Sequence, residues 1–135
     1  MAKELQCILL VDDNEHDNYF HERAIKQLNR KTVIVKKRTG KEGLTYLQSQ
    51  NDNFDPHPDL IFLDINMPGM NGWEFLHEYN KLERRQQGHA IIIMLTTSDN
   101  AEDITRATKW NFVSDFITKP LTREKMASVG KKYFT

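Results

Sequence analysis

Short apolar segments alternate along the chain with segments whose apolar residues recur at helical spacing. The apolar segments are continuous rather than interrupted by polar residues, which is typical of parallel strands covered on both faces. We predict five such strands, at residues 7–11, 32–37, 60–63, 90–95 and 115–118. A segment compatible with a helix follows each strand, and this alternation predicts a doubly wound α/β fold with a parallel sheet and right-handed crossovers.

The five expected helices differ in how clearly the sequence defines their buried faces. Phe20, Ala24 and Leu28 recur every four residues and predict the buried face of the first helix. The second helix, at residues 40–47, and the fourth, at residues 99–110, have thin apolar stripes. The third and fifth helices are indicated by Phe75, Leu76, Tyr79, Leu82, Met126, Val129 and Tyr133.

Composition limits the class of protein. A chain of 135 residues fits one domain, residues 1–135, interrupted by a polar segment at residues 48–58 that predicts a long surface loop. The 19 Lys and Arg residues balance 19 Asp and Glu residues, which argues against nucleic-acid binding. The single cysteine, Cys7, excludes an internal disulfide and a multi-cysteine metal site. Without a signal peptide or an apolar run of about 20 residues, we expect no membrane association and a cytoplasmic location.

Polar residues follow four of the five predicted strands. Ligands of open α/β sheets bind beyond the carboxyl ends of the strands. Asp12 and Asp13 follow the first strand, Asp64 the third, Thr96 the fourth and Lys119 the fifth, so we expect these five side chains to converge. Three crowded carboxylates repel one another, and a divalent cation relieves that repulsion. Carboxylate oxygens favour Mg²⁺. No zinc-ligand spacing links the histidines, for which we expect surface or packing roles.

At these residues the chain resembles a response-regulator receiver domain of two-component signalling, of the stand-alone, chemotaxis-regulator-like type. The resemblance rests on the acid pair Asp12-Asp13, residues 64–72, the pair Thr96-Thr97 and the pair Lys119-Pro120. It extends from Ile8 to the last helix. It implies a flavodoxin-like sheet of five parallel strands in the order 2-1-3-4-5, with five helices.

The resemblance also implies roles for the acidic residues. Asp64 would be the phospho-acceptor, forming an aspartyl phosphate. Mg²⁺ would be held by Asp12, Asp13 and Asp64 together with the main-chain carbonyl of Asn66. The side chains of Asn66 and Ser98 would influence water access to the phosphoryl group and hence its autodephosphorylation.

Further roles concern the other end of the site. Thr96 would offer its hydroxyl and Thr97 its main-chain N–H to the phosphoryl group. Lys119 would pair with the carboxylates at rest and with a phosphoryl oxygen afterwards, aimed by a cis peptide bond to Pro120. Thr96 and Phe116 would form a two-state switch.

The sequence contains no nucleotide-binding glycine loop, so ATP is not expected to be the donor. The resemblance implies a phosphohistidine on a sensor histidine kinase or histidine phosphotransfer protein as donor, with a switched protein–protein contact as output. The leading hypothesis is therefore a signalling module of a phosphorelay and not a turnover enzyme. The alternative is a Mg²⁺-dependent phosphohydrolase with an aspartyl-phosphate intermediate, but such enzymes usually carry Asp where this chain has Asn66. A third possibility is a scaffold that acts without phosphorylation.

One segment departs from the family pattern. Phe112-Val113 stands where many receivers have Gly-Ala, and it is preceded by Asn111, which can adopt the left-handed conformation that Gly usually supplies. Trp110 and Phe112 form either a docking patch or local packing, and we favour packing.

Overall fold

Five parallel strands form one sheet in the order β2-β1-β3-β4-β5. The computed structural model describes residues 5–49, 57–88, 90–97 and 101–134. The strands are β1 (Cys7–Val11), β2 (Val33–Lys37), β3 (Leu60–Leu63), β4 (Ile91–Thr96) and β5 (Val113–Thr118). The helices are α1 (Glu15–Leu28), α2 (Gly40–Gln48), α3 (Gly72–Tyr79), α4 (Arg84–Gln87), α5 (Ala101–Thr108) and α6 (Arg123–Tyr133). The predicted doubly wound fold and strand order are confirmed.

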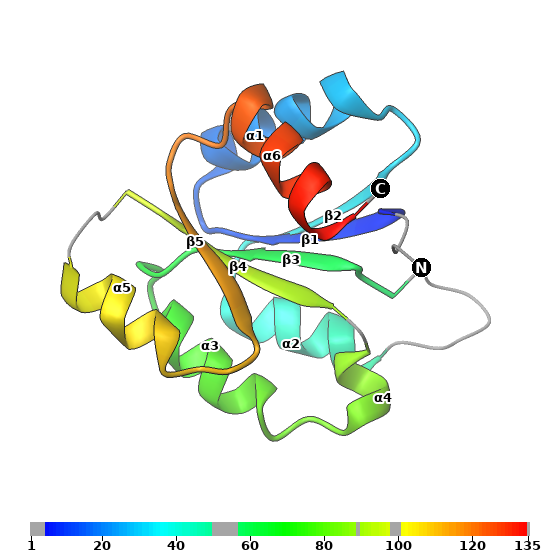
Figure 1. Ribbon diagram of the computed structural model, residues 1–135. Helices are drawn as coiled ribbons and strands as arrows, with labels where there is room; N and C mark the ends of the chain where they lie inside the picture. The colour runs from blue at the N-terminus through cyan, green and yellow to red at the C-terminus, as the bar shows by residue number, and fades with distance from the viewer. Residues whose placement is uncertain (1–4, 50–56, 89, 98–100, 135) are drawn as a thin grey trace.

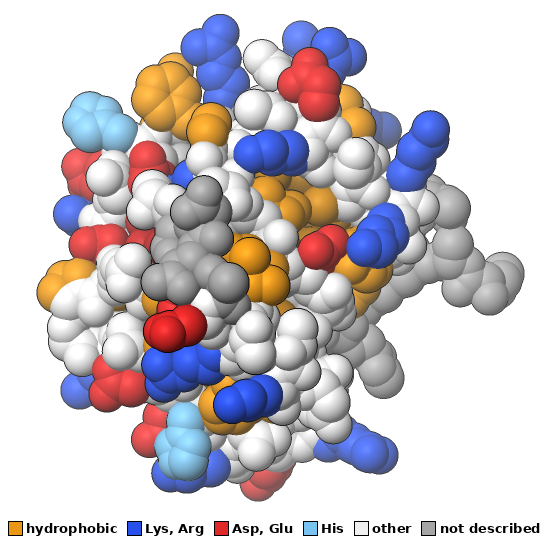
Figure 2. Space-filling view, turned by 60° about the vertical axis from the view of Figure 1, so that its left-hand side comes forward, with side chains coloured by type: hydrophobic (Ala, Val, Ile, Leu, Met, Phe, Trp, Pro, Cys, Tyr) orange, Lys and Arg blue, Asp and Glu red, His pale blue; other side chains and the backbone are white. Residues whose placement is uncertain are grey.

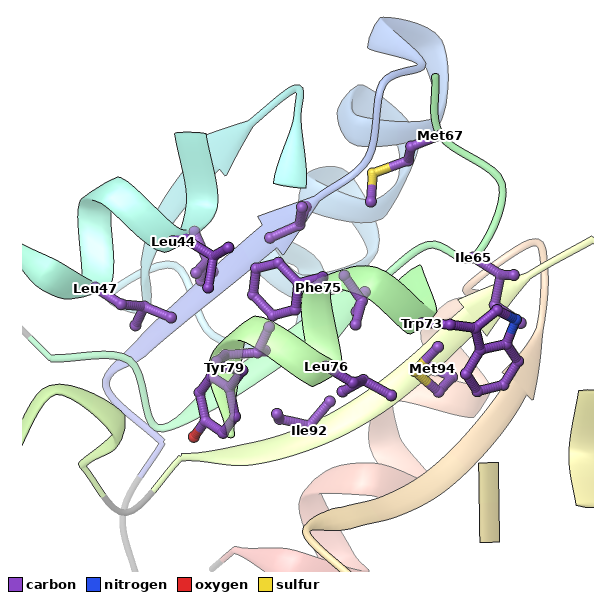
Figure 3. Close-up of a cluster of buried hydrophobic side chains, with 14 of the residues drawn as sticks. Leu44, Leu47, Ile65, Met67, Trp73, Phe75, Leu76, Tyr79, Ile92 and Met94 are labelled. Atoms are coloured by element: carbon purple, nitrogen blue, oxygen red, sulfur yellow. The ribbon is translucent and has the colours of Figure 1, made fainter. Parts of the chain in front are cut away.

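The helices cover both faces of the sheet, which is why the central strands are continuously apolar (Figure 1). Helices α1 and α6 lie on one face, and α2, α3 and α5 lie on the other. Every residue of β1 and β3 is buried. The core is therefore split in two by the sheet, and the larger half gathers side chains of α2, α3 and β4 (Figure 3).

The buried face of α1 differs from the prediction. Phe20 and Leu28 are 56% and 41% exposed, and Ala24 alone of the three predicted residues is buried. The other buried residues are Asn18, His21 and Ile25. The helix is thus rotated so that polar side chains of its first turns point inward. A hydrogen bond from Asn18 Nδ2 to the main-chain oxygen of Asp12, 2.9 Å long, compensates for burial of the amide N–H, whereas Asn18 Oδ1 is buried without a hydrogen-bond partner.

A short sixth helix, α4, was not predicted. It has four residues, none of them buried, so it leaves no apolar periodicity in the sequence. Glu83 and Gln86 form a capping box at its start. His57 Nε2 lies 2.8 Å from the main-chain oxygen of Gln86, so this turn contacts the segment that leads into β3. Residues 50–56 of the predicted surface loop lie outside the described part of the chain.

The turn at residues 110–112, just before β5, packs its aromatic side chains against the core and contains no left-handed residue. No non-glycine residue of the described ranges has a positive φ, so Asn111 does not adopt the left-handed conformation that is open to Asn. The Phe112 ring centroid lies 5.3 Å from that of Tyr79 and 5.6 Å from that of Trp110, and both corner aromatics pack against the larger core. The predicted packing role of Trp110 and Phe112 is confirmed. Strand β5 begins at Val113, two residues earlier than predicted.

Acidic and basic side chains are not segregated on the face that Figure 2 presents. Figure 2 shows acidic and basic side chains interspersed, with apolar patches between them, on the face that it presents. This agrees with the equal numbers of acidic and basic residues. Among the helices that the structure describes, none combines the length and the apolar character needed to cross a bilayer.

Candidate functional site

The carboxyl ends of the strands bring three acidic side chains together. The N–H of Asp12 donates to the oxygen of Lys37, and the N–H of Asp64 donates to the oxygen of Val11, each over 3.0 Å. These bonds extend the parallel ladders one residue past the strands. Asp12, Asp13 and Asp64 each place a carboxylate oxygen within 4.8 Å of the others. The three acidic side chains of the expected convergence therefore lie together.

Asp12 is held from two sides. Its Oδ1 accepts a hydrogen bond from the N–H of Asn14, 3.0 Å long. Its Oδ2 is buried and lies 2.6 Å from the Lys119 Nζ, with which it forms an ion pair. Lys119 is close to two of the three carboxylates, Asp12 and Asp64, so negative charge remains in excess in the cluster. This excess of carboxylate oxygens fits a hard divalent cation such as Mg²⁺.

Asp64 is the most perturbed carboxylate of the site. It is 6% exposed, and burial together with the nearby charge of Asp12 raises its pKa to about 6. The charge of Lys119 and a hydrogen bond from the main chain of Ile65 oppose the shift without cancelling it. A carboxylate whose charge is disfavoured at rest gains from the arrival of a cation or from conversion to an ester-like species.

Lys119 spans the site from β5. Its N–H donates to the oxygen of Thr96 over 2.7 Å, and its bond to Pro120 is a cis peptide. Its side chain is only 8% exposed, and its ammonium lies 3.7 Å from Asp64 Oδ1. Burial opposes its charge, but contacts with Asp12 and Asp17 outweigh burial and raise the pKa of Lys119.

Asp17 is the residue of this site that the sequence analysis missed. Its Oδ2 accepts a hydrogen bond from Lys119 Nζ, 2.7 Å long. The other polar residues of the site follow strand ends, whereas Asp17 lies in the first turn of α1. Because that turn begins directly after the acid pair, an acid five residues beyond Asp12 was the available signal.

The remaining predicted residues differ in how far they are exposed to solvent. Thr96 ends β4 and is fully buried, whereas Thr97 and Asn66 are exposed. Phe116 is half-buried in β5 and packs against the larger core. Ser98 lies outside the described residues.

A glycine brings α3 against the acid-bearing loop. The N–H of Gly72 donates to the oxygen of Ile65 over 2.8 Å. A Cβ at Gly72 would lie 2.6 Å from the main-chain oxygen of Asp64, closer than van der Waals contact permits. Because Gly72 has no side chain, the start of α3 can pack directly against the backbone that carries Asp64.

His21 lies beneath the site and has a packing role, as expected for the histidines. It is 2% exposed. Burial, and then the charge of Lys119, lower the pKa of His21 against the opposing effect of Asp12 and Asp17. The ring is therefore neutral at pH 7.

Comparisons with known proteins agree with this geometry. The family described as the response regulator receiver domain matches residues 8–129. The chain is 33% identical over 126 residues to the probable methanogenesis regulatory protein FilR2 of Methanothrix harundinacea, covering 93% of this chain and 79% of that protein. It spans 54% of the probable C4-dicarboxylate response regulator DctR of Halalkalibacterium halodurans, so part of some relatives lies beyond the matched region.

Solved structures show the same architecture. A two-component response regulator from Cytophaga hutchinsonii superposes with a TM-score of 0.85 at 25% identity, over 97% of this chain and 98% of that one. The Mn²⁺-bound form of the response regulator Rcp1 superposes with a TM-score of 0.74 at 26% identity, over 95% and 93%.

Proposed function

The chain belongs to the response regulator receiver domain family, and from this premise we propose that Asp64 accepts a phosphoryl group from a phosphohistidine. Receiver domains are phospho-acceptor signalling domains rather than turnover enzymes. The donor would be a sensor histidine kinase or a histidine phosphotransfer protein. A carboxylate oxygen of Asp64 attacks phosphorus, the P–N bond of the phosphohistidine breaks, and the leaving imidazole takes up a proton. The product is an aspartyl phosphate.

The acidic cluster supports a role for Mg²⁺ in this reaction. Asp12, Asp13 and Asp64, with the main-chain carbonyl of Asn66, would hold the ion. When bound, it supplies charge neutralisation for the phosphoryl oxygens. The three carboxylates, whose oxygens lie within 4.8 Å of one another, are the feature of this chain that favours such an ion.

The basic and hydroxyl groups would complete phosphoryl binding. Lys119 contributes a buried positive charge 3.7 Å from Asp64 Oδ1, within reach of an oxygen added there. Thr96 offers its hydroxyl, and Thr97 its main-chain N–H. The side chains of Asn66 and Ser98 would set how readily water reaches the aspartyl phosphate and hydrolyses it.

The output would be a change in protein–protein contact. A phosphoryl group adds nearly two negative charges to Asp64, which follows β3, and Thr96 at the end of β4 would move toward it. Phe116, half-buried beside the larger core, would then change its packing. We propose that the domain acts as a cytoplasmic switch for a protein partner.

The observation that carries this proposal is the convergence of three carboxylates and Lys119 at one sheet edge. The test is transfer of radiolabelled phosphoryl groups from a phosphorylated histidine phosphotransfer protein, with Mg²⁺ and with EDTA. We expect labelling of Asp64 that requires the metal and is lost in Asp64→Asn.

Two results would contradict the proposal. Label that persists in Asp64→Asn would mean that another residue is the acceptor. Steady release of phosphate from small phosphoesters over many turnovers would instead favour the phosphohydrolase alternative.

A further inference from the structure

Asp17 engages Lys119 more closely than the proposed acceptor does. Lys119 Nζ donates to Asp17 Oδ2 over 2.7 Å, but it lies 3.7 Å from Asp64 Oδ1. The contact is largely shielded, because the Lys119 side chain is 8% exposed and that of Asp17 is 33% exposed. In this resting arrangement the ammonium therefore lies closer to Asp12 Oδ2, at 2.6 Å, and to Asp17 Oδ2 than to the acceptor.

The first turn of α1 fixes the position of Asp17. Asn14 caps the helix, and its Oδ1 accepts a hydrogen bond from the N–H of Asp17, 3.1 Å long. Asn18, the next residue, donates its side-chain N–H to the oxygen of Asp12. Since the Asn14 side chain supplies the cap, the Asp17 carboxylate is available for Lys119. The backbone that carries Asp17 is thereby tied to the loop that carries the acid pair.

The charges around Lys119 make this contact consequential. One ammonium serves Asp12, Asp17 and Asp64, and the first two contacts raise its pKa. A phosphoryl group on Asp64 brings nearly two further negative charges that also need this cation. Each ion pair that Lys119 keeps at rest must be weakened before it can pair with the phosphoryl oxygens.

We propose that Asp17 is a positioning residue that holds Lys119 in the resting state and competes with the phosphoryl group for its ammonium. Asp17 thereby lowers the affinity of the site for a phosphoryl group and favours the unphosphorylated domain. The inference rests on the proposed function of Asp64 and deepens it, because it adds a side chain of α1 to the resting partners of Lys119.

The test measures binding of beryllofluoride, a phosphoryl analogue that attaches to a carboxylate, in the presence of Mg²⁺. We expect Asp17→Asn to bind it about threefold to tenfold more tightly than the wild type, the effect of losing one partly shielded ion pair. Asp17→Ala repeats the test without an amide. Asp17→Glu restores the carboxylate and should return the affinity toward that of the wild type.

Glu15→Gln is the matched control, because it removes the same charge from the same turn of α1. Glu15 pairs with Arg38 at 3.0 Å and not with Lys119, so its loss should leave beryllofluoride affinity unchanged. A double-mutant cycle distinguishes an effect of Asp17 through Lys119 from direct repulsion between the Asp17 carboxylate and the bound analogue. If Asp17 acts through Lys119, the gain from Asp17→Asn should largely disappear when Lys119→Ala is also present.

The outcomes separate this inference from the proposed function. If the wild type binds beryllofluoride and Asp17→Asn binds it equally or less tightly, the role of Asp17 is refuted and that of Asp64 stands. A gain that persists in full in the Lys119→Ala background also refutes it. If the wild type itself does not bind the analogue with Mg²⁺, the proposed function fails, and the role of Asp17 fails with it.

Discussion

Asp64 carries a charge that the folded protein disfavours. It is buried beside Asp12, and both effects raise its pKa to about 6, above the ordinary value of 3.8. Because the folded state binds this proton more tightly than the unfolded state, ionisation of Asp64 costs stability as the pH rises from 3.8 to about 6. Functional sites commonly retain such destabilising groups.

We predict that Asp64→Asn stabilises the metal-free protein at pH 7. The amide keeps the shape of the side chain and removes the disfavoured charge, so the free energy of unfolding should rise by about 1–3 kcal/mol. The gain should shrink as the pH falls from about 6 toward 3.8, where wild-type Asp64 takes up its proton. Urea denaturation in EDTA at several pH values measures both effects.

The control for this prediction is Glu22→Gln. Glu22 pairs with Lys36 at 2.9 Å on the surface, and its loss should change stability by less than about 1 kcal/mol. An Asp64→Asn variant that is no more stable than the wild type at pH 7 would show that the charge of Asp64 is adequately compensated.

At the scale of the elements, the placement of α3 depends on its first residue being a glycine. Its first residue, Gly72, lies against the main chain of Asp64 and Ile65, and Asn71 and Glu74 form a capping box there. Trp73, Phe75 and Leu76 then anchor the helix in the larger core (Figure 3). The start of α3 is thus fixed from both sides, and the loop bearing Asp64 cannot shift independently of the helix.

We predict opposite effects of alanine at two helical glycines. At Gly72 the added Cβ would lie 2.6 Å from the Asp64 oxygen, so Gly72→Ala should destabilise the fold by about 1–3 kcal/mol and displace the loop that carries Asp64. At Gly130 in α6 an added Cβ would have no atom within 4 Å apart from the nearby backbone of its own helix, so Gly130→Ala should stabilise by roughly 0.5–1 kcal/mol through helix propensity. Thermal unfolding of both variants tests this, and equal effects would contradict it.

Across the molecule, the acidic cluster couples strands that are distant in the sequence. Asp12 and Asp13 follow β1, Asp64 follows β3, and Lys119 reaches in from the end of β5. The two helical layers pack on opposite faces of the same sheet (Figure 1). A ligand at this edge therefore contacts residues whose backbones belong to the whole fold.

We predict that Mg²⁺ stabilises the entire protein. An ion that binds only the folded state at ten to a hundred times its dissociation constant should raise the free energy of unfolding by about 1–3 kcal/mol. Asp13→Asn removes one ligand without altering the buried Asp12 contacts, and it should lose most of this gain. Denaturation at increasing Mg²⁺ concentration measures it, and an equal gain in the variant would place the ion elsewhere.

The strands and their chemistry follow directly from the order of residues. Continuous apolar segments identify buried parallel strands, and parallel strands align their carboxyl ends, so Asp12, Asp64 and Lys119 had to approach one another. A continuous apolar segment can be recognised from neighbouring residues alone, so the strands can be predicted without knowing how they pack.

The rotation of α1, the extra turn α4 and the partner of Lys119 depend on contacts between segments far apart in the chain. Phe20 and Leu28 satisfy helical periodicity, yet Asn18 and His21 occupy the interior, because the first turns of α1 pack against the polar edge of the sheet. Asp17 and Lys119 are separated by 102 positions, and their hydrogen bond forms only once α1 and β5 have been brought together at that edge. The local pattern of apolar residues determines where helices and strands form. Which face of a helix is buried depends on the tertiary structure, because burying apolar side chains competes with forming hydrogen bonds and ion pairs to groups on the sheet.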